Sequence, residues 1–424
     1  MTKALQQISE ALLRCNKCGF CLAGCPIYKA TGIEWTAARG RLALLRSVID
    51  NELELKELKE PLLNCLTCNC CVDHCPSGVT VDELIITARA ELLKTEGQSF
   101  IQRLIFQRIL SNPSRLHSLL RPLRLAQSVG LRSAIRYLGL TKLLGNVGKA
   151  EPILPQLPDH YITSISSPKL EHPLYRVIYF VGCAGINLKP QVPEAAIRVL
   201  NKHNVEVEIL DFACCGMPAY GYGDVASSLT TAKKNIDLAR SLEVDAIITT
   251  CASCGSALKR YPNLLKNDTV YSARANDFAD KVKDISEFLT DIGLIGGMNS
   301  LKYRVTYHDP CHLGRFQNIT SHPRQIIQSI PGVELIEMTE ANTCCGAAGS
   351  YNIGHHDLSM KVLARKMGNV SRTEAELLVT SCPGCSMQLS YGIRKHGLNM
   401  KCLELTELLD LAYCQVSKGK VGKT

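Results

Sequence analysis

Hydrophobic and polar positions follow two different periods along the chain. Up to residue 150, apolar side chains recur at helical spacing, which predicts helices over residues 5–14, 36–58 and 81–94. From residue 175 onward, short apolar runs alternate with amphipathic stretches such as 192–201 and 226–242, which predicts strands separated by helices. The expected strands are residues 177–181, 205–210, 246–250, 305–308, 333–338 and 377–380.

This order of elements predicts the fold class. Strands that alternate with helices form parallel sheets whose faces are covered by those helices. The strand–helix pattern of the second half occurs twice, with corresponding spacing. We therefore expect a multidomain chain in which an α-helical N-terminal part is followed by two duplicated α/β domains with parallel sheets.

The N-terminal part carries two cysteine runs, each with the spacing C-x2-C-x2-C-x3-C-P. They are Cys15, Cys18, Cys21 and Cys25 before Pro26, and Cys65, Cys68, Cys71 and Cys75 before Pro76. Bacterial two-cluster ferredoxins have this spacing, and the fourth cysteine of each run binds the other cluster. The predicted ligands of the two cubane [4Fe–4S] clusters are therefore Cys15, Cys18, Cys21 and Cys75, and Cys65, Cys68, Cys71 and Cys25. Zinc fits less well, because a zinc site takes four ligands rather than two interleaved sets.

The second half carries a different set of five cysteines, and it carries that set twice. The first copy is Cys183, Cys214, Cys215, Cys251 and Cys254, and the second is Cys311, Cys344, Cys345, Cys382 and Cys385. Corresponding cysteines are 128 to 131 residues apart, so the second half is an internal duplication. Each set follows predicted strand ends, at the edge where open α/β sheets bind ligands. A glycine follows each cysteine pair, where it permits a left-handed turn and close backbone approach.

Composition and charge add a compartment and a surface. The chain has 21 cysteines among 424 residues, and its N-terminus has neither an apolar core nor a cleavage site of a signal peptide, so we expect a reducing cytoplasmic location. The net charge of +9 is concentrated between Glu96 and Glu151, where there is no acidic residue. The cations there are Arg103, Arg108, Arg115, Arg121, Arg124, Arg132, Arg136, Lys142 and Lys149.

Those cations alternate with apolar residues at helical spacing, which leaves three interpretations open. The segment lies on an anionic membrane surface, docks an acidic partner subunit, or is a linker packed on its own protein. The first would place the protein peripherally on the cytoplasmic face of a membrane. No nucleic-acid partner is expected, since no motif that reads nucleic acid is present.

The duplicated half resembles the cysteine-rich CCG domains of the heterodisulfide reductase catalytic subunit. The stretches that carry this resemblance are HDPCHLGR from His308, CCGAAGSYN from Cys344 and SCPGC from Ser381. The whole chain, a ferredoxin-like module followed by two CCG domains, is similar to the iron–sulfur subunits of glycolate oxidase and its D-lactate dehydrogenase relatives. The resemblance covers nearly all residues except the basic segment and the C-terminal tail.

The resemblance implies cofactors for the two five-cysteine sets. In heterodisulfide reductase such sets bind noncubane [4Fe–4S] clusters, with all five cysteines as ligands. Glycolate oxidase subunits often carry asparagine where this chain has Cys382, so both sets are complete here, as in heterodisulfide reductase. Zinc at one of the two sets is the alternative. His308 and His312 flank Cys311, where they could tune or ligate the second cluster or relay protons to a bound acceptor. We expect them to pack beside the second centre or to form hydrogen bonds near it.

The implied function is an iron–sulfur electron-transfer subunit of a flavin-dependent 2-hydroxyacid dehydrogenase or oxidase complex that acts on glycolate or D-lactate. FAD is expected only on a partner subunit, because no G-x-G-x-x-G opens a helix after a strand in this sequence. The expected acceptor is a quinone or another oxidant. The alternative is a heterodisulfide reductase-type catalytic subunit, which reduces a disulfide at a noncubane cluster.

The same reasoning predicts the domain boundaries. Prolines at 152, 155, 158, 168 and 173 mark an extended linker between the two halves. The expected parts are a helical ferredoxin-like domain (1–96), the basic amphipathic segment (97–150), the linker (151–174), the first CCG domain (175–298), the second CCG domain (299–416) and a tail (417–424).

Overall fold

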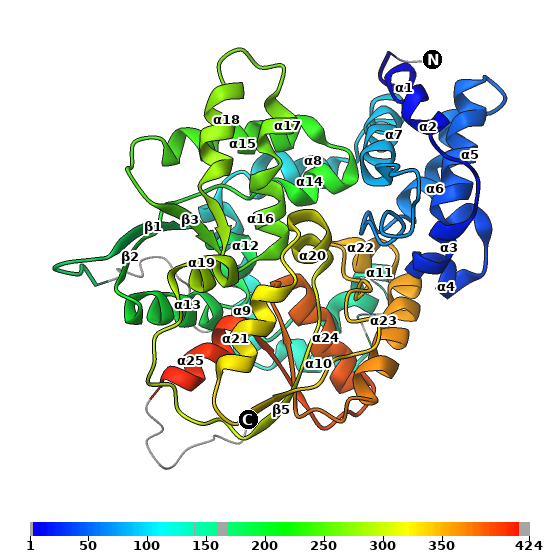
Figure 1. Ribbon diagram of the computed structural model, residues 1–424. Coiled ribbons are helices and arrows are strands. Elements are labelled where there is room, and N and C mark those ends of the chain that lie inside the picture. The colour runs from blue at the N-terminus through cyan, green and yellow to red at the C-terminus, as the bar shows by residue number, and fades with distance from the viewer. Residues whose placement is uncertain (1–2, 140, 142, 144, 159–167, 415–424) are drawn as a thin grey trace.

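The computed structural model describes residues 3–139, 141, 143, 145–158 and 168–414, so the predicted tail, Lys142 and part of the linker lie outside the described residues. The N-terminal part is helical, as predicted, and its helices form one side of the molecule (Figure 1). The predicted helix over 36–58 is divided at Asn51, whose φ of 61° is left-handed. The elements are α1 (Lys3–Gln7), α2 (Ser9–Leu13), α3 (Phe20–Gly24), α4 (Pro26–Thr31), η1 (Glu34–Thr36), α5 (Ala38–Ile49), η2 (Leu55–Leu58), α6 (Lys59–Leu63) and α7 (Val81–Glu96).

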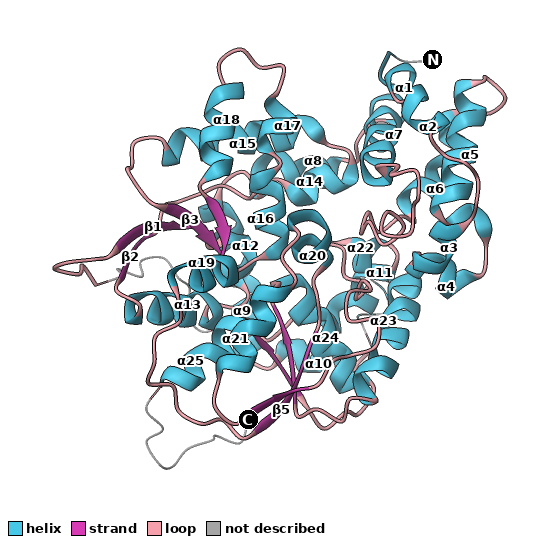
Figure 2. Ribbon diagram, in the orientation of Figure 1, coloured by secondary structure: helices cyan, strands magenta, loops and turns pink. Residues whose placement is uncertain are grey.

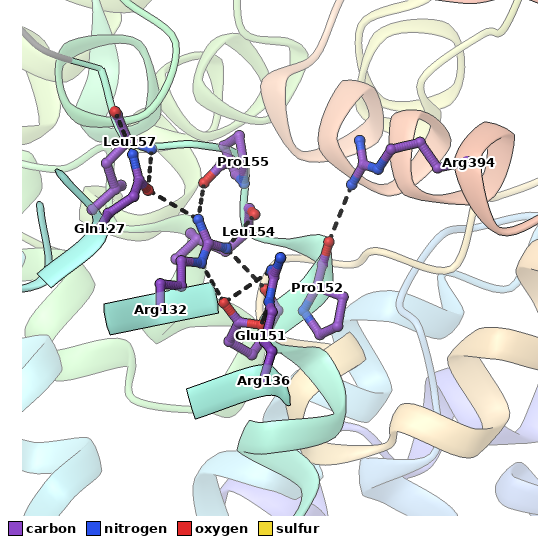
Figure 3. A network of polar contacts seen from close by, with 9 residues as sticks. All are labelled: Gln127, Arg132, Arg136, Glu151, Pro152, Leu154, Pro155, Leu157 and Arg394. Carbon is purple, nitrogen blue, oxygen red and sulfur yellow. Dashed lines mark hydrogen bonds and ion pairs between the residues drawn. The ribbon is translucent and has the colours of Figure 1, made fainter. Parts of the chain in front are cut away.

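The basic segment is also helical. Glu151, the acidic residue that follows it, forms ion pairs with two of its arginines. Its elements are α8 (Phe100–Leu104), η3 (Ile105–Ile109), α9 (Pro113–Ser128), α10 (Leu131–Tyr137), α11 (Gly145–Ala150) and η5 (Glu151–Ile153). Arg132 and Arg136 both pair with Glu151, at 2.5 and 2.7 Å (Figure 3). Arg132 also donates to the backbone carbonyls of Pro155 and Leu154. These two cations therefore hold the segment to the start of the linker.

The first α/β unit contains a four-stranded parallel sheet of order β2-β1-β3-β4. Strand β1 is central because its apolar side chains are buried on both faces, as in other parallel sheets. The strands are β1 (Tyr175–Tyr179), β2 (Val205–Glu208), β3 (Ala246–Thr249) and β4 (Val282–Asp284). The helices are α12 (Gly182–Asn187), α13 (Gln191–Lys202), α14 (Met217–Tyr222), α15 (Val225–Ala239), α16 (Ala252–Lys259), α17 (Tyr261–Leu265), α18 (Ser272–Asp280) and α19 (Ile285–Ile292).

The second unit repeats this topology with the order β6-β5-β7-β8, again parallel, and Figure 2 shows both small sheets surrounded by helices. The predicted fold class is confirmed. The strands are β5 (Tyr303–Tyr307), β6 (Val333–Leu335), β7 (Leu377–Thr380) and β8 (Lys401–Glu404). The helices are α20 (Cys311–Gln317), α21 (Ser321–Ser329), α22 (Tyr351–Gly354), α23 (His356–Ser371), α24 (Pro383–Lys395) and α25 (Leu405–Tyr413).

The two units face each other through matched pairs of helices. Helix α13 packs on α25 while its counterpart α21 packs on α19, and α16 packs on α20 while α24 packs on α12. Such reciprocal pairing is that of an approximate two-fold axis, in which the same faces of both copies meet. The carboxyl ends of both sheets are thereby brought toward one interior region. The helical N-terminal part closes this region from the side, where α4 packs on α23 and α7 packs on α14.

Candidate metal centres

The first predicted ferredoxin set is assembled in the structure. Cys15, Cys18, Cys21 and Cys75 line one small cavity near Arg39 and Leu42, and Cys71 reaches it from the second run. Cys75 therefore lies with the first run, as the interleaved pattern requires. Burial is the largest effect on Cys21 and raises the pKa of its thiol.

The second ferredoxin set lies deeper in the protein. Cys25 is buried at the start of α4, where its sulfur accepts a hydrogen bond from the backbone N–H of Tyr28 at 3.5 Å. Burial raises the pKa of the Cys71 thiol well above its usual value, and the neighbouring Cys65 and Cys25 add to the effect. Cys25 thus lies with the second run. Cys68 is also buried, but its thiol hydrogen-bonds to Cys344 of the second five-cysteine set, which raises the pKa of Cys68.

The first five-cysteine set lies at the carboxyl ends of β1, β2 and β3. Cys183 lies in the first turn of α12, Cys214 and Cys215 follow β2, and Cys251 is the N-cap of α16. Hydrogen bonds from Cys214 and Cys254 lower the pKa of Cys215 well below that of a free thiol. The thiols of Cys214, Cys215 and Cys254 therefore lie within hydrogen-bonding reach of one another, as the ligands of one metal centre must.

The second set has the same placement on β5, β6 and β7. Cys311 begins α20, Cys344 and Cys345 lie in the loop after β6, and Cys382 is the N-cap of α24. Hydrogen bonds from Cys344 and Cys385 lower the pKa of Cys345, the counterpart of Cys215. Thiolate charge at a helix N-terminus is favoured by the unpaired N–H groups and the helix dipole.

Both glycines that follow the cysteine pairs have the predicted left-handed conformation. Gly216 has a φ of 89° and Gly346 a φ of 90°. A Cβ atom at Gly346 would lie 2.8 Å from the backbone oxygen of Ser359, and one at Gly216 would lie 2.9 Å from Oγ1 of Thr231. The turn that presents each cysteine pair therefore depends on glycine in both copies.

All ten of these cysteines line one cavity of about 240 Å³ between the two units. The units meet inside it, because the Cys251 thiol hydrogen-bonds to Cys382 and thereby lowers the pKa of Cys382. The hydroxyl of Ser253 lies 3.6 Å from the same sulfur. The donor set, two groups of five thiols of which eight are buried, fits soft-metal or iron–sulfur ligation better than disulfides. All 21 cysteines are free thiols in the structure.

A buried acid ends the last strand of each sheet. Asp284 caps α19 and accepts hydrogen bonds from the N–H and hydroxyl of Ser286, at 2.9 and 2.5 Å. Its counterpart Glu404 caps α25, and its Oε1 lies 3.4 Å from Nζ of Lys189 of the other copy. Burial raises the pKa of Asp284 to about 6 and that of Glu404 to about 8.

Two features of the site were not apparent from the sequence. The thiol of Cys70 is buried beside Cys68 and Cys344, although the run's spacing is satisfied without it. Arg89 is fully buried and donates to the carbonyls of Leu62, Cys65 and Gly221, so it ties the second ferredoxin loop to α14. These contacts join segments far apart along the chain, which a local motif cannot reveal. The position of Arg89 at helical spacing among the apolar residues of α7 is the signal that could have indicated its burial.

This arrangement of a dicluster cysteine module beside paired cysteine-rich α/β domains defines the class of iron–sulfur oxidoreductase subunits. Residues 11–79 match the family model for a 4Fe-4S dicluster domain. Residues 177–259 and 305–390 match that for the cysteine-rich domain, CCG. Residues 97–154 match the linker region of the glycolate oxidase iron–sulfur subunit. The matches support iron–sulfur clusters as the cofactors.

The chain belongs to the family of glycolate oxidase iron–sulfur subunits. It is 35% identical over 418 residues to the probable glycolate oxidase iron–sulfur subunit of Bacillus subtilis, covering 94% of this chain and 93% of that protein. It is 30% identical over 237 residues to lactate utilization protein A of Oceanobacillus iheyensis, covering 55% of this chain and 96% of that protein. A hypothetical protein from Helicobacter pylori shares the fold, with a TM-score of 0.55 at 11% identity over 90% of this chain and 67% of the other.

Proposed function

We propose that the chain is the electron-transfer subunit of a flavin-dependent 2-hydroxyacid dehydrogenase complex, with glycolate or D-lactate as substrate of a partner subunit that carries FAD. Oxidation of a 2-hydroxyacid to the 2-oxoacid releases two electrons and two protons, and reduction of a quinone takes up two of each. Iron–sulfur clusters accept and release electrons singly. This chain's own contribution is to hold such groups in a fixed order and away from water.

The observation that carries the proposal is the spatial order of the four cysteine sets. The set of Cys15 meets the set of Cys65 through the two interleaved runs. The set of Cys65 meets the second five-cysteine set through Cys68 and Cys344. The second set meets the first through Cys382 and Cys251. This order differs from the order along the sequence, and it supports a path from the ferredoxin-like end to the first CCG unit.

The two ends of this row have different surfaces, which supports a direction for the path. At one end Cys18 is exposed, and we place the FAD subunit there. At the other end the basic segment covers the first CCG set: the backbone N–H of Cys214 donates to the carbonyl of Leu110, at 3.0 Å. Exposed apolar side chains of that segment, including Phe100, Leu125 and Val129, lie among exposed arginines. We place the quinone and an anionic membrane surface at this end.

The noncubane form of the clusters at the two CCG sets belongs to the same proposal, with the ligands assigned by the resemblance. Zinc at one set is the alternative, which the metal content decides. In the part of the chain that the structure describes, no helix is both long and apolar enough to cross a bilayer. Attachment to the membrane would therefore rest on the surface of α8–α10.

The order of the sets is tested by anaerobic reoxidation. The fully reduced protein is mixed with a short-chain quinone, and EPR follows the cubane signal of the Cys15 set. Cys68→Ser removes the set in the middle of the row and should slow reoxidation of that signal by more than about 100-fold. The matched control Cys414→Ser changes an exposed cysteine outside all sets and should leave the rate unchanged. An unchanged rate in Cys68→Ser would contradict the proposed path.

The surface assignment has its own test, which uses sedimentation with vesicles of anionic lipid. Charge reversal of two exposed arginines, Arg103→Glu with Arg121→Glu, should reduce binding by at least about 30-fold, because the loss of two cations alone costs about 2 kcal/mol at roughly 1 kcal/mol per charge. Arg240→Glu changes an exposed cation on the first CCG unit and serves as the control. Equal binding by wild type and the double variant would contradict membrane attachment and leave partner docking as the role of this surface.

A second candidate function follows from the cavity between the two units. Both five-cysteine sets are complete and open into the same 240 Å³ cavity, which favours binding of a small disulfide between them. Reductive cleavage of a disulfide consumes two electrons and two protons and yields two thiols. If the reduced protein releases thiols from an added disulfide at a rate above that of Cys382→Ser, the chain is a disulfide reductase of the heterodisulfide reductase type.

A further inference from the structure

The second CCG set has a nitrogen atom that the first set lacks. His308 follows β5 and is fully buried, and its position in the first copy, 128 residues earlier, is occupied by Phe180. Phe180 is equally buried, but it offers no ligand atom and packs on Phe212 with ring centroids 4.8 Å apart. The duplicated scaffold therefore places an imidazole at one centre and a phenyl ring at the other.

The imidazole is oriented by its second nitrogen. Nδ1 of His308 lies 3.1 Å from the carbonyl oxygen of Ala341, which can only accept a hydrogen bond. Nδ1 therefore carries the proton, and a neutral ring then presents a lone pair at Nε2. Lys366 donates to the same carbonyl at 3.2 Å and to that of Glu340 at 2.6 Å, which holds the acceptor in place.

Nε2 of His308 points into the second CCG set. Among the described residues it has no hydrogen-bond partner, although it is buried away from water. Its ligand atom and the sulfurs of Cys345 and Cys385 all lie within 4.8 Å of one another. A buried polar atom without a partner is costly, and a bound metal would satisfy it. Metal-ligating histidines characteristically donate their other N–H to a backbone carbonyl, as His308 does.

From these observations we propose that His308 Nε2 is a ligand of the metal centre at the second CCG set, beside Cys345 and Cys385. This proposal differs from the expectation that the histidine packs beside the centre or forms a hydrogen bond near it. The inference deepens the proposed function, because it makes the two CCG centres chemically different. In Rieske centres, histidine ligands in place of cysteine raise the reduction potential of an iron–sulfur cluster. The second centre is expected to have a higher potential than it would with sulfur ligands alone.

The test is pulsed EPR of the full chain, purified anaerobically from cells grown with ordinary or ¹⁵N-labelled histidine. We expect one strong nitrogen coupling that changes with the label, as for an imidazole bound directly to iron. His308→Phe, which copies the residue of the first unit, should abolish that coupling and shift the midpoint potential of the second centre to a lower value. His308→Gln should do the same and controls for the change in ring packing.

The matched control is His312→Gln. His312 lines the same cavity, but its Nδ1 lies 3.0 Å from the hydroxyl of Ser256 and its ring stacks on Phe316. This variant should keep both the coupling and the potential. The proposal would be overturned if the label-sensitive nitrogen coupling remained in His308→Phe. It would also be overturned if the second centre of the wild-type protein were paramagnetic and showed no such coupling.

The same ligand assignment can be tested if the second set holds zinc instead of iron. If the second set holds zinc, X-ray absorption at the zinc edge should show a nitrogen neighbour at about 2.0 Å that is lost in His308→Phe. Zinc with sulfur neighbours only, or no metal at this set, would overturn the inference. Failure of the proposed electron path has a different readout, the reoxidation rate of the Cys15 set. If only the ligand assignment is wrong, that rate in both His308 variants equals the rate of the wild-type protein.

Discussion

The two CCG units are copies of one design whose outer contacts have diverged. In the first copy the cysteine pair is covered by the basic segment, through Leu110 and Cys214. In the second copy the corresponding position, Cys344, contacts Cys68 of the ferredoxin-like part. The inner contact, between Cys251 and Cys382, joins equivalent positions of both copies. Duplication thus provides a contact between the two copies by symmetry. The outer contacts differ between the copies, so the two ends of the row of cysteine sets have different neighbours.

The lining of the two centres has diverged as well. Near the second set are His308 and the buried Lys366, whereas Phe180 and Asn235 stand at the corresponding positions of the first. Burial lowers the pKa of Lys366 to about 8, while the neighbouring Cys345 and Cys344 act in the opposite direction. A positive charge near a centre favours its reduced state. We therefore expect the second centre to be reduced more readily than the first.

The change expected to have the largest effect removes a ligand at the contact between the copies. Cys382→Ser should lower the iron content by up to about four atoms per chain, because one ligand of a five-cysteine set is lost. Anaerobic iron analysis measures the loss, and EPR should show both cubane signals at full intensity. Full iron content in this variant would contradict the ligand assignment of the second set.

The next change asks whether the two copies depend equally on their glycines. Gly346→Ala should destabilise the protein by about 2–4 kcal/mol, because the left-handed turn is strained and the new methyl group meets a backbone oxygen. Gly216→Ala should cost about 1–3 kcal/mol, because its nearest neighbour is a side-chain hydroxyl at 2.9 Å rather than a backbone oxygen. Thermal or denaturant unfolding of the anaerobic holoprotein measures both. An equal or reversed order would show that the turns are supported differently from what the distances indicate.

The buried acids of the two copies should affect the pH dependence of folding stability over different pH ranges. With its pKa raised to about 8, Glu404 stays protonated in the folded protein while the unfolded chain ionises near pH 4.5. Stability should therefore fall as pH rises from about 4.5 to about 8, by at most about 1.4 kcal/mol per pH unit, and then level off. Glu404→Gln removes this decline.

The corresponding window for Asp284 is narrower. Two hydrogen bonds from Ser286 stabilise its charged form, and its pKa reaches only about 6. In the second copy Thr406 occupies the position of Ser286, and its hydroxyl has no partner among the described residues. Asp284→Asn should therefore change the pH dependence only below about pH 6. Identical pH profiles for Asp284→Asn and Glu404→Gln would contradict this difference between the copies.

The smallest expected effect concerns the outer contact of the second copy. Lys29 of α4 pairs with Glu340 at 2.8 Å, and Arg365 shares that carboxylate. Arg365 hydrogen bonds act against the effect of burial and, with Lys29, lower the pKa of Glu340 to about 2. Lys29→Met should cost less than about 1 kcal/mol, because the pair is partly exposed. Unfolding at high and low salt measures it, and a larger loss would assign this pair a main role in holding the two parts together.

Much of the fold of the two copies, and all of their CCG cysteines, could be predicted from the sequence. Strand β7 was predicted with its observed bounds because its three apolar residues and a threonine lie between a turn and a cysteine motif. Strands β4 and β8 were missed, since only three or four residues form each of them at the sheet edge, and half or more of these residues are polar. The doubled spacing located all ten CCG cysteines, but it could not show that both sets face one cavity.

The order of the sets in space was beyond any local pattern. It depends on the two-fold packing of the copies and on the docking of the N-terminal helices against α23 and α14. The role proposed for His308 was likewise hidden, because the motif HDPCH does not reveal which histidine has an unpartnered nitrogen. The assigned ligands and the domain boundaries remain predictions.

The most direct test of the central claim, a row of four iron–sulfur centres, is anaerobic quantification of iron and zinc per chain with EPR of the reduced protein. The account predicts about sixteen irons, four for each cysteine set, and little zinc. It also predicts magnetic interaction between the cubane of the Cys65 set and the second CCG centre. About eight irons per chain with zinc at both CCG sets would contradict it, as would two cubane signals that show no magnetic interaction with a third centre.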